Sequence, residues 1–360
     1  MKAEAEPSGS EGAAEAAPRG GGEAAKAAPR GGGEAAKAAP RGGGGAARAS
    51  AMRSRMPGAR ERPRLVLVTR PTPLEVLIDQ FGTYGQARFY LESRGQSIGW
   101  AEETHQRFEA SYARVQAAVP PDERRARVDR ANLSSFLFAP DDVVVVVGQD
   151  GLVANVAKYL DGQLTIGVNP DPQRYDGLLC KHSADDMPRL LAWLASRDER
   201  AFHVQRRAMA QVDREDGQRL LALNEVFVGH RTHQSARYRL RVDGREERQS
   251  SSGLICATGT GGTGWTKSIA RQRHLELTLG VEEPRLVWLV REPFPSVATG
   301  TDLDFGLLDA DAALELVSEM GDDGVIFADG IESDRLDFLS GQLARITLAG
   351  QRLHLVVPTA

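Results

Sequence analysis

The sequence predicts two folded regions, a parallel α/β domain followed by a β-rich domain. Three short runs rich in branched apolar residues, at 64–70, 143–147 and 164–169, are typical of strands buried on both faces. Helical patterns alternate with these runs, and strands that alternate with helices form a parallel sheet. After about residue 200, apolar and polar residues alternate one by one instead, which indicates antiparallel strands.

The helices of the first domain follow from periodicity and from the placement of prolines. Segment 74–118 has a helical, largely polar pattern that ends before Pro120 and Pro121. Segment 185–196 predicts another helix, which tolerates Pro188 in its first turn. A further helix is predicted between these segments. Its apolar face has spacings of three and four residues and consists of Val153, Val156, Ala157 and Leu160.

The β-rich region shows shorter strand patterns, separated by turns such as Asp243-Gly244. Alternating segments cover 203–213, 223–230, 235–244 and 245–259. Further strands are expected at 285–291, 313–318, 324–328, 343–348 and 352–357. We therefore place the α/β domain at 63–200 and the β-rich domain at 201–360.

Residues 1–62 are predicted to form a disordered, low-complexity tail. An eleven-residue unit repeats three times between residues 16 and 48, and Pro-Arg-Gly-Gly-Gly interrupts each copy. The repeats offer no large apolar residue to bury, so nothing offsets the entropy that ordering them would cost.

Charge and composition favour a small-molecule partner. The chain up to Arg64 carries a net charge of +5 and the remainder −9, so nucleic acid is not an expected partner. No stretch approaches the roughly eighteen apolar residues of a membrane span, and the tail lacks the apolar region of a signal peptide. Cys180 and Cys256 lie in apolar contexts typical of buried free thiols, and a cytoplasmic location is predicted.

The turn Gly148-Gln149-Asp150-Gly151 is the first candidate site. It joins a predicted buried strand to a helix, at the carboxyl edge of the sheet, where open α/β folds bind ligands. Asp150 could simply cap the helix. Alternatively, the flanking glycines clear its surroundings for a ribose hydroxyl and a phosphate at the helix N-terminus. We favour the second interpretation, because paired glycines help most where a ligand approaches the backbone.

The second candidate is the glycine- and threonine-rich segment 257–265. Residues 259–264 match the Gly-x-Gly-x-x-Gly pattern of dinucleotide folds, but no clear βαβ unit surrounds them. Trp265 stands where a Walker A loop needs lysine. The segment is either the polar wall of a pocket or a flexible turn.

Two further sequence features are weaker signals, and several catalytic motifs are absent from the sequence. Asn224-Glu225 opens a predicted strand and by itself indicates a surface pair, while Asp329-Gly330 is typical of a hairpin turn. The sequence contains no HExxH or CxxC spacing and no Gly-x-Ser-x-Gly elbow. Neither a protein-bound metal nor an acyl-transfer nucleophile is therefore predicted.

Taken in this order and spacing, these stretches resemble the NAD kinase (ATP-NAD kinase) family. That family carries Gly-Gly-Asp-Gly after a strand, an Asn-Glu-Val triplet and a Gly/Thr-rich segment, and this chain has residues 148–151, 224–226 and 251–265 in their places. The stretch at 166–180, "IGVNPDPQRYDGLLC", is close to a motif of the mitochondrial-type branch. The likeness covers about residues 64–357.

The resemblance implies a Rossmann-like first domain and a β-sandwich-like, NAD-binding second domain. It also implies transfer of the γ-phosphate of ATP, or of another phosphoryl donor, to the adenosine ribose 2′-hydroxyl of NAD, giving NADP. Mg²⁺ would come with ATP. No tightly bound cofactor is implied, NAD and ATP are the expected partners, and a homo-oligomer is expected.

The family's functional residues can be carried over by position. Asp150 would be the general base that takes the 2′-hydroxyl proton. The phosphate loop would consist of Gly148, Gln149 and Gly151. The NAD-binding residues would be Gly151, Asn224, Glu225, Thr263, Gly264, Trp265 and Ser268. Asp329 and Gly330 match a late Asp-Gly of the family.

The chain departs from the family at Gln149, where the family has glycine, and at Leu152, where threonine is common. Three other functions stay open on sequence alone. A non-catalytic NAD-binding sensor would have lost phosphate handling through Gln149, and an NAD-dependent oxidoreductase would be built on residues 259–264. A kinase of the related lipid-kinase superfamily is disfavoured by the Asn-Glu pair.

Overall fold

The computed structural model describes residues 63–359 except 197 and 199. The predicted tail at 1–62 lies outside the described residues. All described residues belong to a single unit of the chain, and no described helix is both long and apolar enough to cross a membrane.

Four parallel strands form the first part of the large sheet. In spatial order they are β2 (Arg125–Asp129), β1 (Leu65–Thr69), β3 (Val143–Val147) and β4 (Leu164–Val168). Every residue of β1 and β3 is buried, as the apolar runs predicted. The chain runs from β1 to β2 on one side and then to β3 on the other side. The carboxyl ends of β1 and β3 are therefore the switch point where such sheets bind ligands.

The predicted helical segment 74–118 forms three helices. These are α1 (Pro73–Phe81), α2 (Tyr84–Glu92) and α3 (Gly99–Ala118). Gly82 ends α1 with a φ of 79°, and the side chain of Thr83 then caps α2. A glycine at positive φ followed by a capping threonine breaks the helix despite its continuous polar pattern.

Two further helices of this region confirm their predictions. Helix α4 (Asp150–Ala157) follows β3 directly, and its apolar face is buried. Helix α5 (Met187–Ser196) has Pro188 at its second position, where the missing N–H costs no hydrogen bond.

Twelve strands follow residue 200 within the described part of the chain. They are β5 (Phe202–Arg214), β6 (Arg219–Ala222), β7 (Glu225–His230), β8 (Ala236–Val242), β9 (Arg245–Ser251), β10 (Leu254–Ala257), β11 (Leu286–Val290), β12 (Phe305–Leu308), β13 (Leu314–Ser318), β14 (Gly324–Ala328), β15 (Ile331–Asp337) and β16 (Leu343–Pro358). Six of them form an antiparallel sheet in the order β12-β11-β10-β7-β14-β15.

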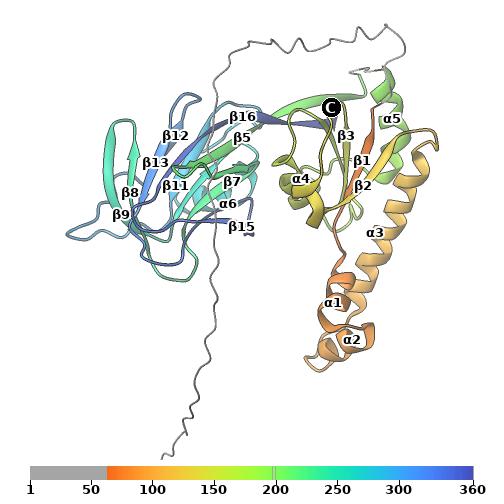
Figure 1. The fold of residues 1–360 in the computed structure, drawn as a ribbon, viewed down its shortest axis with the longest axis horizontal. Coiled ribbons are helices and arrows are strands. Elements are labelled where there is room, and N and C mark those ends of the chain that lie inside the picture. Colours follow the sequence, from red (N-terminus) through yellow and green to blue (C-terminus); the bar gives the residue numbers. More distant parts are fainter. Residues whose placement is uncertain (1–62, 197, 199, 360) are drawn as a thin grey trace, which may run out of the picture. The chain divides into compact units, whose positions relative to one another are not determined.

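The other C-terminal strands continue the large sheet. Strand β16 pairs in parallel with β4 and antiparallel with β5 and β13 (Figure 1). The two strands expected at 343–348 and 352–357 are one strand with a register shift between Leu348 and Arg352. The predicted domain boundary near residue 200 falls between α5 and β5. The sheet continues across it, and the division stays a prediction.

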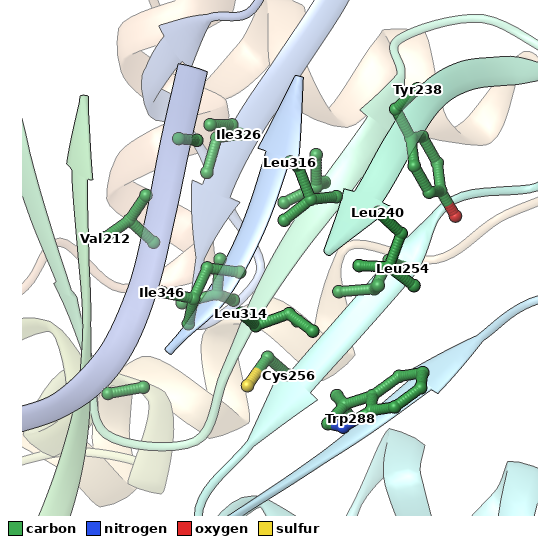
Figure 2. Packing of buried hydrophobic residues seen from close by; sticks show 14 of the residues in the cluster. Val212, Tyr238, Leu240, Leu254, Cys256, Trp288, Leu314, Leu316, Ile326 and Ile346 are labelled. Carbon is green, nitrogen blue, oxygen red and sulfur yellow. The ribbon is translucent and has the colours of Figure 1, made fainter. Parts of the chain in front are cut away.

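The main core of the C-terminal region lies between the two sheets. Figure 2 shows side chains from both sheets meeting there, Leu240 and Ile346 from the large sheet and Cys256 and Ile326 from the antiparallel one. Both cysteines are free and buried, as predicted. An α/β region followed by a β-rich region is thus confirmed in outline.

Five strands and α-helices escaped the prediction, and two of them are β6 and β15, which lie outside every predicted strand range. Strand β2 is short, lies at the sheet edge and has mostly polar residues. Helix α6 (Trp265–Gln272) interrupts the β-rich region after the Gly/Thr segment. Strand β12 has only four residues, of which two are exposed.

Candidate functional site

Two cavities meet at the turn that follows β3. The first, of about 460 Å³, is lined by six of the predicted site residues: Asp150, Asn224, Glu225, Thr263, Gly264 and Trp265. The second, of about 390 Å³, is lined by Gly148, Gln149, Asp150 and Gly151, together with residues of the segment 174–180. Asp150 lines both cavities. We call the first the nucleoside cavity and the second the phosphate-loop cavity.

Asp150 is held by backbone groups from another part of the chain. Helix α4 begins at Asp150 itself, so the N-cap position belongs to Gln149. The Asp150 carboxylate accepts hydrogen bonds from the N–H groups of Leu178 (2.8 Å), Leu179 (2.9 Å) and Cys180 (2.9 Å). The carboxylate is therefore oriented by the 178–180 loop and not by capping its own helix, which rules out the simple helix-cap interpretation.

Two glycines let this loop approach. A Cβ at Gly167, in β4, would lie 2.4 Å from the carbonyl oxygen of Leu179. A Cβ at Gly177 would lie 2.4 Å from the carbonyl oxygen of Cys180, and Gly177 has a φ of +64°. Any side chain at either position would push the loop away from Asp150. The stretch 166–180 matched a motif of the mitochondrial-type branch, but no role was predicted for either glycine.

The Asn224-Glu225 pair is fixed from behind by Asp329. The Asp329 carboxylate accepts hydrogen bonds from the N–H groups of Leu223 (3.1 Å) and Asn224 (2.6 Å). Asp329 and Gly330, both at positive φ, form the hairpin turn between β14 and β15 that the sequence predicted. Neither lines the nucleoside cavity. They support the cavity wall, and the surface-pair interpretation of Asn224-Glu225 is wrong because both residues line the cavity.

Two carboxyl groups have raised pKa values, that of Glu225 in the cavity wall and that of Asp329 behind it. Burial, and then the charge of Asp329, raises the pKa of Glu225 to about 7. Burial raises the pKa of Asp329 to about 6, against the opposing effect of its backbone hydrogen bonds and of Lys158. Glu225 can therefore donate as well as accept hydrogen bonds near neutral pH.

The Gly/Thr-rich segment packs on the backbone of the same wall. The Thr258 hydroxyl donates to the carbonyl oxygen of Leu223 at 2.6 Å. A Cβ at Gly261 would lie 2.2 Å from the carbonyl oxygen of Asn224. The segment is thus a packed cavity wall and not a flexible turn. It follows β10, whose partners β7 and β11 are both antiparallel, so it lacks the βαβ setting of a dinucleotide fingerprint.

Trp265 and Ser268 both lie on α6, but only Trp265 lines the nucleoside cavity. The Trp265 ring stacks on Phe227 with 5.7 Å between ring centroids, and the Arg291 guanidinium lies 4.9 Å from the Trp265 centroid. Trp265 also lines the nucleoside cavity. Ser268 is exposed and does not line it. The structure therefore does not bring Ser268 together with the other predicted residues.

Two arginines near Asp150 were missed by sequence reasoning. Arg207, in β5, is buried and lines the nucleoside cavity. Arg70, directly after β1, donates from Nη2 to Oε1 of Gln149 at 2.6 Å. The position of Arg70 at the carboxyl end of a buried strand was a usable signal, whereas Arg207 carries no motif. Across the described residues there is no cluster of three or more His, Cys, Asp or Glu side chains that could hold a metal ion.

Sequence comparison finds relatives among the NAD kinases. The chain is 31% identical to mitochondrial NAD kinase 2 of Rattus norvegicus, over 42% of this chain and 54% of that protein. It is 28% identical to the Homo sapiens protein of the same name, over 42% and 52%. It is 29% identical to the NAD kinase of Rhizobium meliloti, over 35% and 49%. The chain thus spans about half the length of these relatives, and no family model matches it.

Solved structures show the same fold. An NAD kinase from Archaeoglobus fulgidus in complex with ATP superposes with a TM-score of 0.52 at 18% identity, covering 82% of this chain and 93% of that one. Yeast NADH kinase complexed with NADH superposes with a TM-score of 0.52 at 13% identity, covering 83% and 84%.

One prediction is overturned by these relatives. Two of them are mitochondrial proteins by name, which contradicts the cytoplasmic location that we expected. That expectation was wrong because buried free thiols indicate a reducing environment and not a particular compartment. On the larger point, motifs, relatives and fold agree: the chain is similar to NAD kinases in sequence and in fold, and mitochondrial NAD kinase 2 is among the relatives that it resembles.

Proposed function

We propose that this chain is an NAD kinase, which transfers the γ-phosphate of ATP to the adenosine ribose 2′-hydroxyl of NAD. The position of Asp150 carries the proposal. Its carboxylate lies in the wall shared by the nucleoside cavity and the phosphate-loop cavity. A base between an acceptor site and a donor site is what direct phosphoryl transfer requires.

The nucleoside cavity is the acceptor site. Its polar groups come from Asn224, Glu225 and Thr263, and Trp265 supplies an aromatic ring. A Glu225 carboxyl with a pKa of about 7 can both donate to and accept from ribose hydroxyls. The adenosine half of NAD would bind here, with its 2′-hydroxyl directed toward Asp150.

The phosphate-loop cavity is the donor site. The N-terminus of α4 and the glycines at 148 and 151 offer backbone N–H groups to the phosphates. Mg²⁺ would enter with ATP and neutralise charge on the phosphates. It prefers one or two carboxylates besides phosphates and water. Asp176, an exposed carboxylate that lines this cavity, is the residue that would contact it.

The Asp150 carboxylate can accept one hydrogen bond in addition to those that it already accepts. Two carboxylate oxygens offer about four acceptor positions, and three are taken by the N–H groups of residues 178–180. The fourth would accept the 2′-hydroxyl and then its proton. The 2′-oxygen forms a bond to the γ-phosphorus while the bond from that phosphorus to the bridging oxygen breaks. The electron pair of that bond leaves with ADP.

Several finer features belong to the same proposal. The first domain, 63–200, would be Rossmann-like and the second, 201–360, β-sandwich-like and NAD-binding. A homo-oligomer and a donor other than ATP, such as polyphosphate, are expectations carried by the family. The sensor alternative rests on Gln149, whose side-chain oxygen accepts a hydrogen bond from Arg70.

The test is NADP formation by the full chain from NAD and Mg-ATP, beside Asp150→Asn. The variant should lose about 10²–10⁴-fold in kcat, the usual contribution of a general base. Asp79→Asn, in exposed α1, is the matched control and should keep full activity. Melting temperatures and NAD binding show whether each variant is folded. NAD binding without any NADP formation by the wild type would support the sensor instead.

A further inference from the structure

Arg207 is a buried arginine that lacks a carboxylate partner. It lies in β5 and is only 6% exposed. Its hydrogen-bond partners, Gln205 and Thr260, are both uncharged. No carboxylate of the described residues lies within ion-pair distance of its guanidinium. Arg214, the other buried arginine of β5, instead pairs with Asp216 at 2.5 Å.

The guanidinium of Arg207 is oriented by neutral groups. Nε and Nη2 donate to Oε1 of Gln205 at 3.2 and 2.9 Å, and Nη1 donates to Oγ1 of Thr260 at 3.5 Å. Arginine has five N–H groups, so two remain without a protein partner. Arg207 lines the nucleoside cavity, as do Gln205 and Thr260. The free donors are therefore available to a ligand in that cavity.

A buried cation without a counter-ion is costly. Burial lowers the pKa of Arg207, and the charges of Asp150 and Glu282 act in the opposite direction. An anionic ligand in the cavity would compensate the guanidinium at short range. The fixed geometry suits phosphate, which arginine binds through paired N–H groups.

Asp150 indicates which phosphate this is. Asp150 and Arg207 line the same cavity and are not within ion-pair distance of each other, so a group can lie between them. If Asp150 takes the 2′-hydroxyl proton, the transferred phosphoryl group is attached to the oxygen beside Asp150. The phosphoryl group is negatively charged and would therefore compensate the positive charge of the Arg207 guanidinium.

We propose that Arg207 binds the 2′-phosphate of the product, and the same phosphoryl group during its transfer. The inference deepens the proposed function and rests on it. It makes Arg207 a residue that distinguishes NADP from NAD, because only NADP carries the 2′-phosphate. It also predicts that the site binds NADP more tightly than NAD.

The experiment measures the affinities of the full chain for NADP and for NAD by calorimetry. Arg207→Gln should weaken NADP binding about tenfold to a hundredfold, the range for a lost hydrogen bond to a charged group. NAD binding should change by less than about threefold. Arg207→Lys should recover part of the NADP affinity, because the charge returns without the paired donors.

The neighbouring arginine provides a matched control. Successive side chains of a strand point to opposite faces, so Arg206 lies on the exposed side of β5. Arg206 does not line the cavity. Arg206→Gln should leave both affinities unchanged. Melting temperatures identify a variant that fails to fold, in which case Arg207→Lys alone carries the comparison.

Two outcomes would overturn the inference. Equal losses for NAD and NADP would mean that Arg207 binds the pyrophosphate or the adenosine, and unchanged affinities would mean a structural role. Failure of the proposed function is recognised separately. A wild-type chain that makes no NADP would remove the kinase, whereas a wild-type chain that makes NADP without an NADP-specific loss in Arg207→Gln would remove only the role of Arg207.

Discussion

The guanidinium of Arg70 donates a hydrogen bond of 2.6 Å to the side-chain oxygen of Gln149. Arg70 follows β1 and Gln149 follows β3, so this bond crosses the switch point of the sheet. Burial lowers the pKa of Arg70, and the charge of Arg130 lowers it further. Among the described residues Arg70 has no ion-pair partner. Gln149, where the family has glycine, therefore holds an uncompensated cation beside the phosphate loop.

This relationship predicts the effect of restoring the family glycine. Gln149→Gly should raise the KM for ATP about tenfold, because the phosphate loop loses the hydrogen bond that holds residue 149 to Arg70. The KM for NAD should stay the same, since Gln149 does not line the nucleoside cavity. Steady-state kinetics with each substrate varied in turn measures both values. A lower KM for ATP would mean that Gln149 obstructs the donor.

Gln149→Glu is the sharper companion variant. It keeps Arg70 in place through an ion pair but sets a negative charge against the incoming phosphates. Its KM for ATP should exceed that of Gln149→Gly. Equal KM values for ATP in both variants would show that a charge at residue 149 does not affect ATP binding.

The Gly/Thr segment offers a test with adjacent residues. Gly261→Ala should lower the free energy of unfolding by about 1–3 kcal/mol and raise the KM for NAD. The reason is that its Cβ would meet the carbonyl oxygen of Asn224 at 2.2 Å. Gly262→Ala should stay within about 0.5 kcal/mol of the wild type, because a Cβ there meets nothing within 4 Å. Denaturant melts measure both, and similar losses would contradict the packed wall.

The raised pKa of Glu225 predicts a pH dependence of stability. Its pKa rises from 4.5 to about 7 on folding, so the folded state binds this proton more tightly than the unfolded state. Stability from Glu225 is therefore lost as the pH rises through that window. Glu225→Gln should be the more stable protein at pH 8, by on the order of 2 kcal/mol, and should match the wild type near pH 4. Melts across pH test this, and a difference that does not change with pH would refute it.

Local signals predicted well the edge of the sheet that carries the candidate site. The valines of β3 specify a buried strand, and two glycines around Asp150 mark the turn, without reference to any distant residue. The break of the 74–118 segment was also encoded locally, in Gly82 and Thr83, but its polar pattern concealed it. Strand β2 escaped because an edge strand with polar residues lacks the apolar run that identifies its neighbours.

What the sequence could not reveal depends on long-range contacts. Gly167 resembles any strand glycine until the 178–180 loop is placed against it. Arg206 and Arg207 are adjacent and identical in type. Only the register of β5 decides that one is exposed and the other lines the cavity. The pairing of β16 with β4 joins positions nearly two hundred residues apart, which no local pattern records.

Phosphoryl transfer to a single hydroxyl is tested most directly by ³¹P NMR of the product. The full chain, incubated with NAD and Mg-ATP, should yield ADP and a phosphate ester on the adenosine ribose 2′-oxygen. Asp150→Asn, still folded and still binding NAD, should yield almost none. A product phosphorylated elsewhere, or equal turnover by the wild type and Asp150→Asn, would contradict the account.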